Sequence, residues 1–315
     1  MKYLKKLVNN YNSLKMDELK KKVEVKNNIY CFNISDQITK SVTDFYKNNP
    51  FPNYKNDDNK ASILNSGDKN YLAKIFKNFV GFNKKVLEIG CGTGQLSAYF
   101  AIGTNNQITG LDPTLASLQL ATKFSSENNL KNIKFVNADI FDDVFKENSF
   151  DYIWCNGVLH HTKDPYGAFK ISIRYLKKNG YILIGLYNKI GRIRTNIRKY
   201  IYRLFGKKII LKIDPILRKK KLKSDDQIEA WIRDQYIHPV ESTHSYDEVL
   251  KWFKANNIDF INSIPKVNFD ELNKDLFEKT KKGNIFTRLL SQISMIFNSY
   301  GDDGGLFIFI GKKNA

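Results

Sequence analysis

The stretch VLEIGCGTGQ at Val86–Gln95 decides the fold class of this chain. Its apolar beginning predicts a buried strand, and a helix is expected to start after it, at Leu96. Between the two lie Gly90, Gly92 and Gly94, which let the backbone turn tightly and let a ligand approach the main chain. A glycine-rich turn also suits an ordinary strand-to-helix connection, so its meaning depends on the residues that follow.

The rest of the chain alternates between apolar runs and helical patterns. Strands are expected at Lys85–Gly90, Gln107–Asp112, Asn132–Asp139, Phe150–Asn156, Tyr181–Asn188, Ile258–Pro265 and Gly305–Lys313. Helices are expected after Asp68 as N-cap, with Leu72, Ile75, Phe76 and Phe79 on the apolar face, and at Leu96–Gly103, Leu115–Asn128, Ala168–Gly180, Tyr246–Asn256 and Ile285–Phe297. Gly180 is expected to close its helix. Strands alternating with helices predict right-handed βαβ units and a parallel sheet.

Two carboxylates follow the glycine stretch at the ends of expected strands. Asp112 lies about 20 residues beyond the glycines, as expected for a carboxylate that accepts hydrogen bonds from ribose hydroxyls. Asp139 ends the next strand and precedes Ile140. The glycines and both acids are therefore expected at one edge of the sheet, where ligands of doubly wound folds bind.

With Glu88 ahead of its glycines, VLEIGCGTGQ resembles the first motif of class I methyltransferases that use S-adenosylmethionine (SAM). A nicotinamide cofactor site would instead carry GxGxxG without that glutamate. The resemblance continues through GLDPT, NADIF and CNGVLHHTKDP, and the last of these is similar to the type 11 group. It covers roughly Asp68–Asn188 plus the final strand. It implies a Rossmann-like α/β fold whose seven-stranded, mostly parallel sheet has its last strand antiparallel.

The resemblance also implies roles for individual residues. Glu88 and the glycine backbone would hold the methionine part of SAM, and Asp112 the ribose diol. Asp139 and Ile140 would flank the adenine, and Asn156 and Gly157 would line the pocket near the transferred methyl group. The full set of implied cofactor-binding residues is Glu88, Gly90, Cys91, Gly92, Gly94, Asp112, Pro113, Asp139, Ile140, Asn156 and Gly157.

The candidate residues for contact with the methyl acceptor are histidines and aromatic residues. A histidine can act as a base at neutral pH, and His160 and His161 lie just past the fourth expected strand, so they are the catalytic candidates. The alternative is that they only pack or cap the following turn. Phe51, Tyr54, Tyr187, His238 and His244 are expected acceptor contacts. No metal site is expected, because Cys31, Cys91 and Cys155 show no ligand spacing and fit reduced thiols.

The first 67 residues are interpreted as an N-terminal extension. A basic helix is expected over Met1–Lys22, and a hairpin over Val23–Phe32 with Asn27-Asn28 as its turn. PFPNY (Pro50–Tyr54) is expected to be an extended strap over the site, or else to pack on the sheet edge. The polar stretch Asn53–Gly67 is expected to be a loop.

The formal net charge is +19, and much of it lies between Lys189 and Lys223, where Asp214 is the only acid. Within RIRTNIRKYIYRLF, one helical face carries Ile193, Ile197, Ile201 and Leu204, with arginines around it. This basic helix could lie on an anionic membrane or hold a phosphate backbone. It could also be a cap whose apolar face covers the active site and whose charges face water.

The sequence therefore predicts four parts: an extension over 1–67, a SAM-binding core over 68–188, a basic helical cap over 189–256, and the end of the core sheet over 257–315. The expected function is transfer of a methyl group from SAM to an oxygen or nitrogen of a small or medium-sized molecule. An RNA or tRNA methyltransferase, and a catalytically silent SAM-binding or membrane-surface protein, are the alternatives. No apolar run reaches the roughly 18–20 residues that span a bilayer, and no signal peptide is evident, so a cytoplasmic protein is expected.

Overall fold

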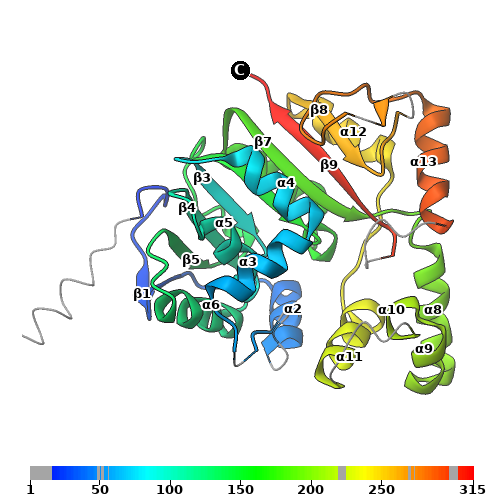
Figure 1. Cartoon of the computed structure of the whole chain (residues 1–315), viewed down its shortest axis with the longest axis horizontal. Coiled ribbons are helices and arrows are strands. Elements are labelled where there is room, and N and C mark those ends of the chain that lie inside the picture. The colour runs from blue at the N-terminus through cyan, green and yellow to red at the C-terminus, as the bar shows by residue number, and fades with distance from the viewer. Residues whose placement is uncertain are drawn as a thin grey trace, which may run out of the picture.

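The computed structural model of this chain is built around one large sheet with helices on both faces (Figure 1). It describes residues 16–47, 50, 53–55, 57–218, 225–268, 271–272, 274–297 and 304–315. Within these residues the sheet has nine strands in the order β1-β2-β5-β4-β3-β6-β7-β9-β8. Their bounds are β1 Glu24–Lys26, β2 Ile29–Cys31, β3 Lys85–Ile89, β4 Gln107–Asp112, β5 Ile133–Asn137, β6 Phe150–Asn156, β7 Leu176–Tyr187, β8 Ile258–Ile264 and β9 Leu306–Lys313.

The seven strands predicted from the sequence form the continuous part from β5 to β8, which confirms the predicted fold class. β5, β4, β3, β6 and β7 are parallel, and β9 runs antiparallel between β7 and β8. The chain order reverses between β3 and β6, which is the switch point at which doubly wound sheets bind ligands. A ligand site is therefore expected at the carboxyl ends of these strands.

The predicted hairpin is present and adds two strands to the sheet. β1 and β2 are joined by Asn27 and Asn28, whose φ values of 50° and 64° match a tight two-residue hairpin turn. β2 then pairs in parallel with β5, with Ile29 opposite Phe135. The sheet is therefore longer by two strands than the seven expected.

Helices cover both faces of the sheet and bury its apolar side chains. One face packs against α3 (Lys60–Lys69), α4 (Tyr71–Val80) and α5 (Gln95–Ala101), which lie in front of the sheet in Figure 1. The other face packs against α7 (Pro165–Tyr175) and α12 (Tyr246–Ala255). α6 (Leu115–Glu127) covers the neighbourhood of β2 and β5. Two buried layers hold the parallel strands rigidly, so their ends can position a site.

Three local predictions were wrong, and a fourth fails in the part that the structure describes. Asn53–Gly67 is not all loop, because Asn59 caps α3 through a capping box with Ser62. Asp68 is not the N-cap of the next helix; Asn70 caps α4, and the Asp68 carboxylate accepts a 2.8 Å hydrogen bond from Tyr99.

Gly180 does not close a helix, because α7 ends at Tyr175 and Leu176 already pairs with Phe150 in β7. Gly180 lies instead where the register between β6 and β7 shifts. Of the expected helix Met1–Lys22, residues 1–15 lie outside the described residues. Residues 16–22 form turns, and Leu19 bridges to Phe145.

The basic segment is helical, and it forms a group to one side of the sheet (Figure 1). Its elements are α8 Ile193–Phe205, α9 Lys207–Ile213, α10 Pro215–Arg218, α11 Asp225–Ile232 and the π-helical turn η3 Arg233–Ile237. A small core of its own contains Ile210, Trp231 and Tyr236. α13 (Ile285–Phe297) lies above α8 in the same view. None of the helices in the described ranges is both long and apolar enough to cross a membrane.

Candidate active site

A cavity of about 480 Å³ lies at the carboxyl ends of the parallel strands. Its walls come from the ends of β3 and β4 and from the turns after β5 and β6. Ten of the eleven residues predicted to bind the cofactor line it: Glu88, Gly90, Cys91, Gly92, Asp112, Pro113, Asp139, Ile140, Asn156 and Gly157. The structure therefore brings together residues that are far apart in the sequence.

Gly94 is the exception, and its role is structural. It precedes α5 with φ of 72°, and a Cβ there would lie 2.8 Å from Ala121. Gly90 also has a positive φ, of 71°, and a Cβ there would lie 2.4 Å from Val158. Only glycine fits such close approaches without displacing a neighbour. The glycines let the turn pack tightly between neighbouring elements.

Asp112, at the end of β4, is hydrogen-bonded to the glycine turn. Its carboxylate accepts hydrogen bonds from the Gly92 amide at 2.8 Å and the Thr114 amide at 2.7 Å. Burial raises the pKa of Asp112, and the two amides oppose that rise. Each oxygen is thus held in place while keeping capacity for a further donor.

Glu88 lies deeper, on β3, where it accepts a hydrogen bond from the hydroxyl of Ser97. Burial raises the pKa of Glu88 to about 8, against the effect of that hydroxyl, and the charge of Asp112 adds to the rise. A buried carboxylate of this kind gains by meeting a cation. The two acids therefore give one end of the cavity the chemistry to hold an ammonium and a diol.

Asp139 is held by an element that the sequence did not indicate as part of the site. Its carboxylate accepts from the Phe141 amide at 3.0 Å and from the hydroxyl of Thr39. Thr39 belongs to α2 (Gln37–Lys47), which also contributes Val42 and Tyr46 to the cavity wall. α2 follows the hairpin and lies over the carboxyl edge of the sheet (Figure 1).

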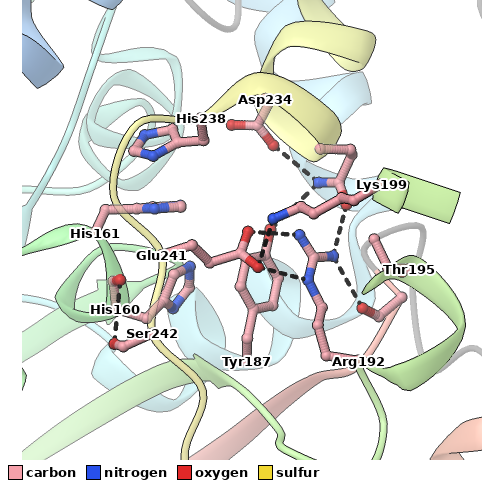
Figure 2. A network of polar contacts seen from close by, with 12 residues as sticks. His160, His161, Tyr187, Arg192, Thr195, Lys199, Asp234, His238, Glu241 and Ser242 are labelled. Carbon is pink, nitrogen blue, oxygen red and sulfur yellow. Dashed lines mark hydrogen bonds and ion pairs between the residues drawn. The ribbon is translucent and has the colours of Figure 1, made fainter. Parts of the chain in front are cut away.

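The other end of the cavity is lined by Tyr46, His161, Tyr187 and Asp234. The Tyr46 hydroxyl donates to Asp234 at 2.9 Å, which joins α2 to η3. Figure 2 shows how Tyr187, His161 and Asp234 lie around the neighbouring network of polar side chains. This end combines aromatic surface with hydrogen-bonding groups, as pockets for small molecules do.

His161 is the histidine that reaches the cavity. Its Nδ1 lies 2.7 Å from the Val240 carbonyl, so Nδ1 carries the proton and Nε2 is left as an acceptor. Burial lowers the pKa of His161 although Asp234 acts in the opposite direction. The ring stacks on His238 at 3.7 Å between centroids. His161 is therefore neutral at pH 7, with its basic nitrogen unprotonated.

The other three histidines do not line the cavity. His160 is fully buried, and its ring lies 4.0 Å from that of Tyr187. His238 packs on His161 and Phe45, and its pKa is lowered to about 3, first by burial and then by His161. His244 lies just before α12 and is hydrogen-bonded to Ser242 and Glu248.

The expected strap is only partly described. Phe51 lies outside the described residues. Tyr54 stacks on Phe124 of α6 at 4.5 Å, and its buried hydroxyl has no hydrogen-bond partner within the described residues. Gln95 donates to the Asn53 carbonyl at 3.0 Å. This segment packs on the helices beside the glycine turn, and Tyr54 does not line the cavity.

A family model described as a methyltransferase domain matches residues 82–284, which include β3 and most of the residues that line the cavity. The chain belongs to this methyltransferase family. The matched range also includes the helical insertion from α8 to η3, so His161, Tyr187 and Asp234 of the cavity wall lie inside the matched domain.

Two curated relatives of this methyltransferase carry the name ubiquinone biosynthesis O-methyltransferase. The protein of Actinobacillus pleuropneumoniae is 31% identical over 139 residues, which cover 42% of this chain and 56% of that protein. The protein of Pseudomonas putida is 27% identical over 178 residues, which cover 55% of this chain and 73% of that protein. The chain therefore spans little more than half the length of the first of these relatives.

Among solved structures, PKMT2 of Rickettsia typhi in complex with AdoHcy resembles this methyltransferase with a TM-score of 0.54. The sequence identity is 17%, and the match covers 77% of this chain and 52% of that one. At this identity the likeness shows the shared fold.

A buried arginine lies behind the cavity wall, and no sequence motif indicated its role. Arg192 belongs to the basic segment, yet its side chain is buried and lies 3.6 Å over the ring of Tyr187. It donates to Glu241 at 2.8 Å (Figure 2). It also donates to Gln235 at 2.7 Å. Lys199 also pairs with Glu241, at 2.7 Å. Part of the positive charge of the insertion is therefore paired inside the protein behind the cavity wall and does not face water.

Proposed function

We propose that this chain transfers a methyl group from SAM to an oxygen or nitrogen of a small or medium-sized molecule. The observation that carries the proposal is that a single cavity is lined by two chemically different groups of residues. One end has Glu88, the glycine turn and Asp112, and the other has Tyr46, His161 and Asp234. A donor and an acceptor bound at these two ends would meet near Asn156 and Gly157.

The residues at the first end fit SAM. The Asp112 carboxylate is fixed by two amides and keeps acceptor capacity for the ribose hydroxyls. Glu88 would meet the ammonium of the methionine part, which suits a carboxylate whose burial otherwise favours its neutral form. Asp139 and Ile140 would flank the adenine. SAM supplies a methyl group already activated by its sulfonium, so the protein has mainly to align donor and acceptor.

At the second end, His161 is proposed as the general base. Its Nδ1–H is directed to Val240, so Nε2 is the free acceptor of the ring. A hydroxyl or amine acceptor hydrogen-bonded to Nε2 would pass its proton there as the new bond to carbon forms. The neighbouring Asp234 would stabilise the imidazolium that results, since its charge raises the pKa of His161. His160 is less suited, because it is enclosed away from the cavity.

The relatives support an aromatic acceptor with an ionisable hydroxyl. Two proteins named ubiquinone biosynthesis O-methyltransferase are similar to this chain, and that name specifies an oxygen acceptor. The ring of Tyr46 would contact an aromatic acceptor, while Asp234 and His161 would contact its hydroxyl. The acceptor is therefore proposed to be a phenol or a similar planar molecule.

Methylation with isotopically labelled SAM, screened over phenols, amines and carboxylic acids of increasing size, tests the proposal. Incorporation into a phenol or amine is expected. Calorimetry with SAM alone is run in parallel. Binding without turnover on any acceptor would indicate a catalytically silent SAM-binding protein, and label incorporated only into RNA or protein would overturn the small-molecule acceptor.

A further inference from the structure

The outer face of α13 is apolar where a surface helix would ordinarily be polar. Phe286, Leu289, Leu290 and Ile293 are exposed on it, and Phe286 has 66% of its surface accessible. The polar side chains of the same helix lie inward: Arg288, Ser291 and Gln292 are buried. Arg288 pairs with Asp247, and Ser291 donates to the Lys266 carbonyl at 2.9 Å. The helix is thus anchored by its polar face and presents its apolar face outward.

α8 repeats this arrangement. Ile193, Ile197 and Leu204 recur at helical spacing, and the exposed fractions of Ile197 and Leu204 are 56% and 59%. Thr195 and Lys199 lie on the opposite side, which packs inward. The apolar face predicted from the sequence therefore exists, but it points to solvent. The expectation that it covers the active site was wrong, because Arg192 and Lys199 occupy the inner side and pair with Glu241.

The two helices share one side of the molecule. Arg194 of α8 donates to the Ile296 carbonyl near the end of α13 at 2.9 Å, and Figure 1 shows α13 above α8 along the same edge. α9 continues the surface with exposed Ile209 and Ile213. Of twenty large hydrophobic side chains that are exposed within the described residues, eight lie in α8 and α9 and six in α13. A single concentration of this kind marks an interaction surface.

Cations dominate this surface, and the neighbouring acids Glu229 and Asp247 are each paired with a cation of α9 or α13. α8, α9 and α13 contain no acidic residue. Exposed cations border the apolar side chains at Arg203, Lys208 and Lys212, and at Lys281 and Lys282 just before α13. Exposed aromatic rings, Tyr200 and Phe286 among them, lie between. Apolar side chains with rings and surrounding cations match the boundary between acyl chains and anionic headgroups.

We propose that α8, α9 and α13 form a docking surface for an anionic lipid bilayer, on which the protein lies without crossing it. The apolar side chains would enter the headgroup boundary, and the bordering cations would meet lipid phosphates. A nucleic acid is disfavoured, because a phosphate backbone offers nothing to cover the apolar side chains at the centre of the surface. The inference is independent of the proposed methyl transfer.

Sedimentation of the full-length protein with vesicles tests it. Vesicles of phosphatidylcholine with phosphatidylglycerol are expected to bind the protein, and vesicles of phosphatidylcholine alone to bind it much less. Added salt should weaken binding, since it screens the cations. Absence of binding to anionic vesicles would overturn the proposal. Calorimetry of SAM binding on the same preparation reports the donor site separately, so failure of one proposal is distinguishable from failure of the other.

The double variant Phe286→Glu with Ile293→Glu removes two apolar contacts and adds two negative charges. Its partition onto anionic vesicles should fall about tenfold or more, given the apolar area withdrawn from the bilayer. Phe82→Glu is the matched control, because Phe82 is 63% exposed and lies outside these helices. The control should bind vesicles like the unaltered protein. Equal binding by the double variant would overturn the proposal.

Two further measurements distinguish other occupants. Sedimentation velocity would detect a dimer: self-association lost in the double variant, without vesicle binding, would assign the surface to a second copy of the chain. Binding to RNA that is lost in Arg203→Glu with Lys208→Glu but kept in the double apolar variant would assign it to a phosphate backbone. Either result would overturn the bilayer proposal.

Discussion

The phenol of Tyr46 donates a 2.9 Å hydrogen bond to Asp234, which joins two residues 188 positions apart on the wall of one cavity. Tyr46 comes from α2, before the core sheet begins, and Asp234 from η3 in the helical insertion. Burial chiefly raises the pKa of Tyr46, and the Asp234 charge adds to the rise, so the phenol stays a donor. The contact ties the N-terminal extension to the insertion across the acceptor end.

Tyr46→Phe should lower the free energy of unfolding by about 1.5 kcal/mol, because a partly buried hydrogen bond to a carboxylate is lost. Urea unfolding measures the change. Tyr71→Phe serves as control, since Tyr71 is exposed, and its effect should be within about 0.5 kcal/mol. SAM affinity should stay the same in Tyr46→Phe. Equal stability of the two variants would contradict the structural role given to this contact.

Asp112→Ala should weaken SAM binding about tenfold to a hundredfold. The expected loss corresponds to the roughly 1.5–3 kcal/mol of a hydrogen bond to a charged group. Calorimetric titration with SAM measures it, and Asp44→Ala on the exposed side of α2 is the control. Asp112→Asn should lose less, because the amide oxygen still accepts one bond. Unchanged affinity in Asp112→Ala would remove the assignment of the ribose to this carboxylate.

Glu88→Gln should alter how stability depends on pH. The pKa of Glu88 is raised from 4.5 to about 8, first by burial, so the folded chain keeps a proton that the unfolded chain releases. Between these two values the unfolded state binds fewer protons, and the free energy of unfolding falls as pH rises. Above about 8 this contribution no longer changes.

Glutamine resembles the protonated acid and does not titrate. The advantage of Glu88→Gln over the unaltered protein should therefore be larger at pH 8 than at pH 5 in denaturant unfolding. Glu24→Gln, at a carboxylate whose side chain is 65% exposed, should show no such difference. A stability difference that is constant with pH would mean that Glu88 is ionised in the folded state throughout.

His161→Asn should lower turnover on the order of a hundredfold, which is a modest contribution for a general base. Asparagine can still donate to the Val240 carbonyl in place of Nδ1–H, but it cannot take the acceptor's proton. Steady-state kinetics on the acceptor found by the screen measures this loss, and SAM affinity should not change. The pH at which turnover rises should shift toward the pKa of the acceptor's own hydroxyl or amine. Turnover near that of the unaltered protein would make His161 a packing residue.

The donor end could be predicted from the sequence because its residues belong to local motifs at strand ends. A strand, a glycine turn and a helix follow one another between Lys85 and Ala101, and the sheet then brings Asp112 and Asp139 to the same edge. Any parallel sheet with this order of strands would do so. The hairpin at Asn27-Asn28 was predictable for a similar reason, since its turn is set by adjacent residues.

Only part of the acceptor end could be predicted: His161 and Tyr187 were among the candidates, but other residues reach the cavity through contacts between distant segments. Thr39 and Tyr46 carry no motif, and they reach the cavity only because β2 joins β5 and places α2 above the sheet edge. Among the four histidines, only burial and tautomer separate His161 from His160. Composition cannot supply either property.

The sequence by itself determined the alternation of strands and helices, the glycine turn with its two acids, and the apolar stripe of α8. Periodicity and chain order are local properties, and they settle which residues share a strand end or a helix face. Only the tertiary structure decided which way that stripe points. The buried pairing of Arg192 and Lys199 with Glu241 turns the polar side of α8 inward, because a buried charge must be paired, and leaves Ile197 and Leu204 facing solvent.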